Sequence, residues 1–251
     1  MLHAINQNKT KFYKRYLGHR DGDNIRVQEE DEITSLIMSP LSLLHPKEIG
    51  IFWQRLVSFD SQYELPSDPV NNAEMIFWPR RRRCNIEPDM LVNLEWDSGE
   101  KWSLLVEFKW HAQLSGENQL QKQWEKFLLD DERLNAYHVF ISPNLSCAIN
   151  AKINNDVWEG RLLLRSWLHV LSILDHFDAD PEAFGLLLWS KQVTSVLKRL
   201  QIAPFIGFDR ILQEPIIPLN QNSWLFFNKF SGFRRFDPLS LHVIKYNFFK
   251  K

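Results

Sequence analysis

Short segments of alternating character in the middle of the chain predict a β-sheet between two helical regions. Three of them combine β-branched and aromatic residues, and the letters DSGE supply turn chemistry between the last two. We expect strands at residues 73–78, 89–96 and 101–110, with the last two forming a hairpin. The segment AYHVFIS, residues 136–142, predicts a further strand that stops at Pro143.

Apolar residues at helical spacing predict helices on both sides of these strands. The first of them begins with several acidic residues, which favour the positive end of a helix dipole, and Pro40 is expected to end or bend it. Helices are therefore expected at residues 29–44, 48–59 and 115–131, followed by a helix-rich region at residues 160–177 and 183–200.

The order helix, strands, helix, strand indicates an α/β or α+β core in which helices flank a mixed central sheet. We divide the chain into an amino-terminal extension, residues 1–25, a core, residues 26–150, and a carboxyl-terminal region, residues 151–251. The last region is expected to be helical, then basic and aromatic, and to pack on the core.

Composition is that of a soluble globular protein, with 44% apolar and 24% charged residues in 251. The amino terminus lacks an apolar signal region, and the longest apolar stretches are far shorter than the ~20 residues of a membrane span. Cys84 and Cys147 lack metal-ligand spacing, which favours two reduced thiols over a disulfide. We therefore expect a cytoplasmic protein with no membrane association.

Charge is distributed unevenly although the formal net charge is only −1. Residues 191–251 carry ten Lys or Arg and three acids, a net charge of +7, which leaves −8 for residues 1–190. This asymmetry makes the carboxyl-terminal segment a candidate for holding a polyanion. Equally, it is compatible with a cationic surface that balances an acidic body.

The candidate chemistry lies in the segment LLVEFKW, residues 104–110. Because side chains alternate along a strand, Glu107 and Lys109 point to one face, and Val106 and Phe108 point to the other. If the preceding strand pairs through the DSGE turn, Asp89 lies near the Glu107 end of the hairpin. Two carboxylates and a lysine then converge in one patch.

Such a patch is costly as structure alone, since buried carboxylates repel each other and isolated buried charge is unfavourable. A divalent cation resolves the conflict, and hard oxygen ligands suit Mg²⁺. The ion would acidify a bound water and neutralise charge on a phosphodiester. Lys109 would stay protonated beside the carboxylates and position the attacking water, help to deprotonate it, or stabilise the developing charge.

The pattern Pro88-Asp89, seventeen intervening residues and then Glu107-Phe108-Lys109 resembles the signature of the PD-(D/E)XK nuclease superfamily, which has the restriction-endonuclease-like fold. The order of elements is similar too: a helix with an acidic residue, a strand with Asp, a strand with Glu-x-Lys, a helix and a further strand. The resemblance covers roughly residues 26–142. It implies a Mg²⁺- or Mn²⁺-dependent phosphodiesterase.

Members of this superfamily also carry a glutamate on the first helix and a glutamine on the helix after the lysine strand. The resemblance therefore implies Glu30 as a further metal ligand beside Asp89 and Glu107, with Glu32 as the substitute if the register differs. Gln119 and Gln123 are four residues apart and share a helix face, so one of them is a candidate to orient the lysine, a water or a phosphate. Their alternative role is that of ordinary surface glutamines.

Basic residues outside this patch are candidate nucleic-acid contacts. Arg80, Arg81, Arg82 and Arg83 precede the Asp89 strand, where they are placed to grip phosphates, with a solvated charge run as the alternative. The tail NSWLFFNKFSGFRRF interleaves aromatics with cations, a composition compatible with stacking on unpaired bases or with packing against a partner.

Together these features predict a metal-dependent nuclease, with DNA as the favoured substrate and a role in phage defence, restriction, mobile-element processing or repair. The alternative is a catalytically silent subunit that keeps the nuclease fold and acts as a nucleic-acid-binding or assembly module, with a protein partner.

Overall fold

The computed structural model of the chain describes residues 5, 29–60, 62–110, 114, 118–154, 156–177 and 183–203. All of them belong to one compact unit, Met1–Pro204. In chain order its elements are α2 (Glu29–Leu41), α3 (Pro46–Val57), β1 (Val70–Phe77), β2 (Met90–Trp96), β3 (Lys101–Phe108), α4 (Gln119–Lys122), the π-helix η2 (Gln123–Phe127), α5 (Asp130–Leu134), β4 (Ala136–Ile141), α6 (Ser146–Asn154), β5 (Leu162–Arg165), α7 (Trp167–Asp175) and α8 (Phe184–Arg199).

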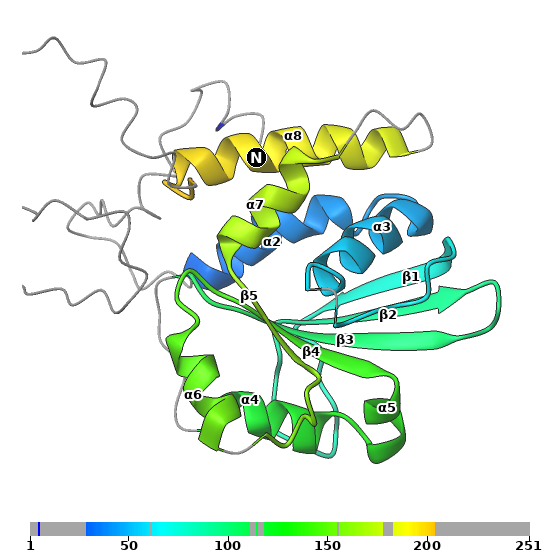
Figure 1. The fold of residues 1–251 in the computed structure, drawn as a ribbon, viewed down its shortest axis with the longest axis vertical. Coiled ribbons are helices and arrows are strands. Elements are labelled where there is room, and N and C mark those ends of the chain that lie inside the picture. Colours follow the sequence, from blue (N-terminus) through cyan, green and yellow to red (C-terminus); the bar gives the residue numbers. More distant parts are fainter. Residues whose placement is uncertain are drawn as a thin grey trace, which may run out of the picture. The chain divides into compact units, whose positions relative to one another are not determined.

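The strands form one mixed sheet in the order β1-β2-β3-β4-β5 (Figure 1). The pairs β1–β2 and β2–β3 are antiparallel, whereas β3–β4 and β4–β5 are parallel. The predicted hairpin joins β2 to β3, and Gly99 of its turn has φ +80°, a left-handed conformation that favours glycine. The structure therefore confirms the predicted α/β class with a mixed sheet flanked by helices.

Helices cover both faces of this sheet (Figure 1). The helices α2, α3, α7 and α8 lie on one face, and α4, α5 and α6 lie on the other. Along β3, Leu104, Val106 and Phe108 belong to the core under the first layer, and Leu105 belongs to the core under the second. Because both faces are covered, the second part of the strand, residues 104–108, is buried without alternation.

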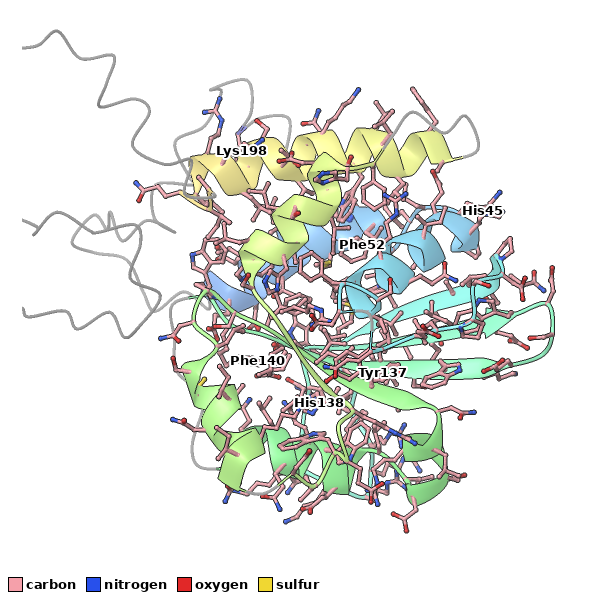
Figure 2. All side chains as sticks on the ribbon, viewed as in Figure 1. His45, Phe52, Tyr137, His138, Phe140 and Lys198 are labelled. Carbon is pink, nitrogen blue, oxygen red and sulfur yellow. The ribbon has the colours of Figure 1, made fainter. Side chains whose placement is uncertain are left out.

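Aromatic side chains pack within the first helical layer and between the second layer and the sheet; Figure 2 labels Phe52 of the first contact and His138 of the second. In the first layer, Phe52 of α3 packs edge to face on Trp189 of α8, with ring centroids 5.1 Å apart. In the second, His138 of β4 accepts a hydrogen bond at Nδ1 from Trp158 Nε1 at 3.0 Å and stacks on Trp124. Burial lowers the pKa of His138 to about 3, so this histidine is neutral and structural.

The predicted helix at residues 160–177 is wrong in its first part, because Leu162–Arg165 is strand β5. A short continuous apolar run does not distinguish a buried strand from a buried helix by its period. Helix α6 was not predicted. The helix expected at 115–131 is divided among α4, η2 and α5, since Leu128 is extended (φ −79°, ψ 144°).

Residues beyond 150 also form part of the sheet and of its helical cover. Strand β5 is the fifth strand of the sheet, and α8 supplies part of the first helical layer, so both lie in the same unit as the hairpin. The amino-terminal extension, apart from residue 5, and the basic, aromatic tail lie outside the described residues. In the part of the chain that is described, no helix has both the length and the apolarity to cross a membrane.

Candidate functional site

The hairpin brings Asp89 and Glu107 to the same end of the sheet. Met90 of β2 pairs with Val106 of β3, a register that puts Asp89 opposite Glu107. Asp89 Oδ2 accepts a hydrogen bond from the backbone N–H of Phe108 at 2.7 Å. Its other oxygen accepts no hydrogen bond from a described residue. One carboxylate oxygen therefore remains available beside the end of β3.

The Glu107 side chain is only 1% exposed and is held by three donors. Gln119 Nε2 donates to Oε1 at 2.6 Å, and Gln123 Nε2 donates to Oε2 at 2.7 Å. Lys109 Nζ lies 3.0 Å from Oε1. The two glutamines thus orient the carboxylate directly, and the face of β3 that carries Glu107 is covered as fully as the opposite face.

The first helix of the core contributes Glu30 to this site. Glu30 Oε2 accepts from Lys109 Nζ at 3.1 Å, and its Oε1 accepts from the backbone N–H of Trp110 at 3.0 Å. Residues two apart on a helix point to different faces, so Glu30, and not Glu32, is the glutamate of α2 that reaches the lysine. Lys109 therefore joins a carboxylate of α2, Glu30, to a carboxylate of β3, Glu107, at the end of the sheet.

The carboxylates of this site repel one another. Burial, repulsion from Glu107 and a smaller repulsion from Asp31 raise the pKa of Asp89 to about 8, although Lys109 opposes the shift. The metal-free site therefore retains a proton on Asp89 near neutral pH. This is the behaviour of an acidic cluster whose negative charge exceeds its positive charge.

Lys109 is the cation of the cluster. Burial alone would lower its pKa, but the neighbouring carboxylates, Glu107 first and then Glu30, outweigh burial and raise that pKa. The side chain is consequently a permanent ammonium in this environment. It can donate hydrogen bonds and stabilise negative charge, but it is a poor base.

The donor set is compatible with a hard divalent cation. Mg²⁺ uses one or two carboxylates and keeps several waters, and Asp89 and Glu107 face each other as such a pair. A carboxylate has about four lone-pair sites, of which Glu107 uses three for hydrogen bonds. Among the residues that the structure describes, no group of three or more His, Cys, Asp or Glu side chains is arranged to hold a metal ion. The fit is thus to two carboxylates and water, and the predicted third ligand, Glu30, pairs with Lys109 instead.

Three of the four arginines before β2 are engaged in contacts with protein groups. Arg81 makes a bidentate pair with Glu132, at 2.6 and 2.8 Å, and Arg83 donates to the backbone oxygen of Phe127 at 3.0 Å. Arg80 pairs with Glu87. Of the predicted phosphate contacts, Arg81 and Arg83 therefore have structural partners.

Arg82 differs from its neighbours. Its side chain is exposed and forms no ion pair with the part of the chain that the structure describes. It is the arginine of this run that is available to a ligand.

Two residues of this region were not predicted. Asp31 and Trp78 meet beside the hairpin, where Trp78 Nε1 donates to Asp31 Oδ1 at 3.3 Å and Trp78 N donates to the Asp89 backbone oxygen at 2.9 Å. The acidic run at residues 29–32 contained a signal for Asp31. Nothing in the sequence distinguished Trp78 from the tryptophans of the core.

Comparisons with known proteins assign no family: no family model matches the chain, and no curated protein and no solved structure matches it.

Proposed function

We propose that the protein is a divalent-metal-dependent nuclease that hydrolyses phosphodiester bonds in DNA. The observation that carries the proposal is the excess of carboxylates around a single buried ammonium at the end of the β2–β3 hairpin. Asp89 faces Glu107, Lys109 lies 3.0 Å from Glu107, and burial together with repulsion from Glu107 raises the pKa of Asp89. A cation with a phosphate substrate would relieve that repulsion.

Support for the superfamily comes from the motif and from the order of elements. The residues Asp89, Glu107 and Lys109 stand in the order and spacing of the PD-(D/E)XK signature, and they lie on neighbouring strands of a mixed sheet. We therefore propose the restriction-endonuclease-like fold as the finer description of the confirmed α/β class. Function still depends on the site and not on the fold.

Asp89 and Glu107 would hold Mg²⁺ or Mn²⁺, which supplies an acidified water and neutralises charge on the phosphodiester. Gln119 and Gln123 keep the Glu107 carboxylate oriented through their amide donors. Lys109, held as an ammonium by its carboxylate neighbours, donates to oxygens on which negative charge develops as the phosphorus–oxygen bond breaks. Glu30 positions the Lys109 side chain.

The biological setting that we propose is phage defence, restriction, mobile-element processing or repair in the cytoplasm, with a protein partner as activator. The resemblance to the superfamily supports this setting.

A plasmid-nicking assay with Mg²⁺, Mn²⁺ or EDTA tests the proposal. We expect metal-dependent nicking that Asp89→Ala and Lys109→Ala each reduce by about 10²- to 10⁴-fold, the range of a lost catalytic group. Matched controls are Asp97→Ala and Lys101→Ala, which alter exposed residues at the opposite end of the same hairpin. Nicking by both catalytic variants at the wild-type rate would refute the assignment.

One observation favours a second candidate, a catalytically silent binding or assembly subunit. The Glu107 oxygens already accept hydrogen bonds from two glutamines and a lysine, so the charge of this carboxylate is partly satisfied without an ion. For such a subunit, DNA binding would survive in Asp89→Ala and no metal would produce nicking.

A further inference from the structure

Trp78 has a strained backbone beside the catalytic hairpin. Its φ is +46°, a left-handed conformation that is a genuine outlier for a bulky residue. The hydrogen bond from Trp78 N to the Asp89 backbone oxygen, at 2.9 Å, ties this conformation to the residue that faces Glu107. Outliers of this kind persist where the surrounding structure holds them, and they cluster at functional sites.

The indole of Trp78 is fixed but not buried. Its Nε1 donates to Asp31 of α2, and the side chain remains partly exposed. Of the nine tryptophans that the structure describes, only Trp78 and Trp102 are partly exposed, and Trp102 stacks on Tyr137 at the other end of the hairpin. Trp78 is thus the described tryptophan with aromatic surface next to the proposed active site.

A free cation follows it closely in the chain. Arg82 is exposed and has no ion pair among the described residues, whereas Arg81 is held by Glu132. Arg81 and Arg83, on either side of Arg82, bond to Glu132 and to the Phe127 carbonyl in the second helical layer, whereas Trp78 bonds to Asp31 in the first. The oriented indole beside Asp89 is therefore the group placed to meet an unpaired base, since aromatic side chains stack on the bases of single-stranded nucleic acid.

We propose that Trp78 forms a stacking subsite for an unpaired nucleotide next to the scissile phosphate, so that the substrate is DNA with a single-stranded segment at the cut. The base stacks on the indole. In a duplex, the base faces are covered by their neighbours and cannot stack on a side chain. This inference rests on the proposed nuclease function, and it names the substrate class of the same site.

Trp78→Gly is the sharpest variant, because glycine removes the ring and adopts a positive φ without strain. Binding is measured by fluorescence anisotropy of the full-length protein in EDTA, with a fluorescein-labelled single-stranded oligonucleotide and with its duplex. We expect Trp78→Gly to weaken single-strand binding by about tenfold or more, the effect of a lost stacking contact, and to leave duplex binding unchanged. Trp78→Phe keeps a ring and should retain most of the affinity.

Trp102→Ala is the matched control and should change neither affinity, since Trp102 lies at the far end of the hairpin. Equal losses for both oligonucleotides in Trp78→Gly, or no loss in either, would overturn the proposal. So would a wild-type protein that binds no single-stranded DNA.

The two levels of the proposal fail separately. If single-strand selectivity depends on Trp78 but no metal supports cleavage, the subsite stands and the nuclease function falls. If metal-dependent cleavage requires Lys109 but does not distinguish the two substrates, the nuclease stands and the subsite falls.

Discussion

Arg165 and Lys109 are both buried cations, at the ends of β5 and β3 respectively, but their surroundings differ. Arg165 donates to the backbone oxygens of Leu56 and Val57 at 2.7 and 2.8 Å, and to the Asp60 carboxylate at 3.0 Å. These carbonyls end helix α3, where the helix dipole favours a positive charge. Arg165 therefore has one carboxylate, the exposed Asp60, and neutral acceptors for its other donors.

Lys109, by contrast, has more acids than it can neutralise. Glu30 and Glu107 lie within 3.1 Å of its ammonium, and Asp89 stands opposite Glu107. Arg165 is therefore a buried charge whose role is structural. The surroundings of Lys109, in contrast, favour the binding of a further cation. In the first case each guanidinium nitrogen has an acceptor. In the second, an excess of negative charge remains that the described residues do not balance.

The largest expected effect on stability is that of Arg165→Met. The substitution leaves two buried carbonyls and a carboxylate without their donor, and we expect the free energy of unfolding to fall by about 3–5 kcal/mol, with or without Mg²⁺. Urea denaturation measures it. Lys198→Met, which breaks an exposed pair with Asp175, should cost less than about 1 kcal/mol. Equal losses in the free energy of unfolding for the two variants would show that the buried contacts of Arg165 stabilise the protein no more than an exposed ion pair does.

At the acidic cluster, removing a charge should raise the free energy of unfolding of the metal-free protein, whereas removing Arg165 lowers it. Between pH 3.8 and about 8, Asp89 holds a proton in the folded state that it lacks in the unfolded chain. The folded state binds more protons, so the free energy of unfolding falls as pH rises through this window. We expect Asp89→Asn to flatten that fall and to exceed the wild type at its upper end by roughly 0.5–2 kcal/mol.

The measurement is urea denaturation in EDTA at both ends of the window, reported as the difference between variant and wild type so that other titrating groups cancel. Asp97→Asn, at the exposed turn of the same hairpin, is the control. A wild-type protein that gains no stability from Asp89→Asn at any pH would show that the cluster carries no unfavourable charge.

The smallest expected effects on stability are those of Arg81→Ala and Arg82→Ala, which differ because Arg81 has an ion pair with Glu132 and Arg82 has none among the described residues. Arg81→Ala removes a partly buried bidentate pair with Glu132 and the contact of its guanidinium with the Phe127 ring, and should cost about 1 kcal/mol. Arg82→Ala should change stability by less than about 0.5 kcal/mol. Thermal denaturation of the two variants checks this order, and a larger loss for Arg82→Ala would mean that Arg82 has a structural partner.

The local sequence pattern was sufficient to predict the β2–β3 hairpin and the cluster of Asp89, Glu107 and Lys109 at its end. The turn between β2 and β3 and the alternation around Glu107 are encoded in adjacent residues, and so is the placement of Asp89 opposite Glu107. Strand β5 was not predicted because the run Leu162–Arg165 is buried on both sides and lacks the alternation that identifies a strand.

Contacts between residues far apart in the chain could not be predicted from local sequence patterns. The engagement of Arg81 by Glu132 joins residues 51 positions apart. The choice of Glu30 over Glu32 depends on how α2 is rotated against the sheet, which packing decides. Trp78 has the composition of a core residue, and only its backbone conformation and its partial exposure single it out.

The most direct test of the central claim is anomalous scattering from crystals grown with Mn²⁺, compared with crystals of Asp89→Asn. The account predicts a manganese peak about 2.1 Å from an oxygen of Asp89 and from an oxygen of Glu107, with Lys109 beside it, and a weakened or absent peak in the variant. Saturating Mn²⁺ that leaves no peak between Asp89 and Glu107 in the wild-type protein would contradict it.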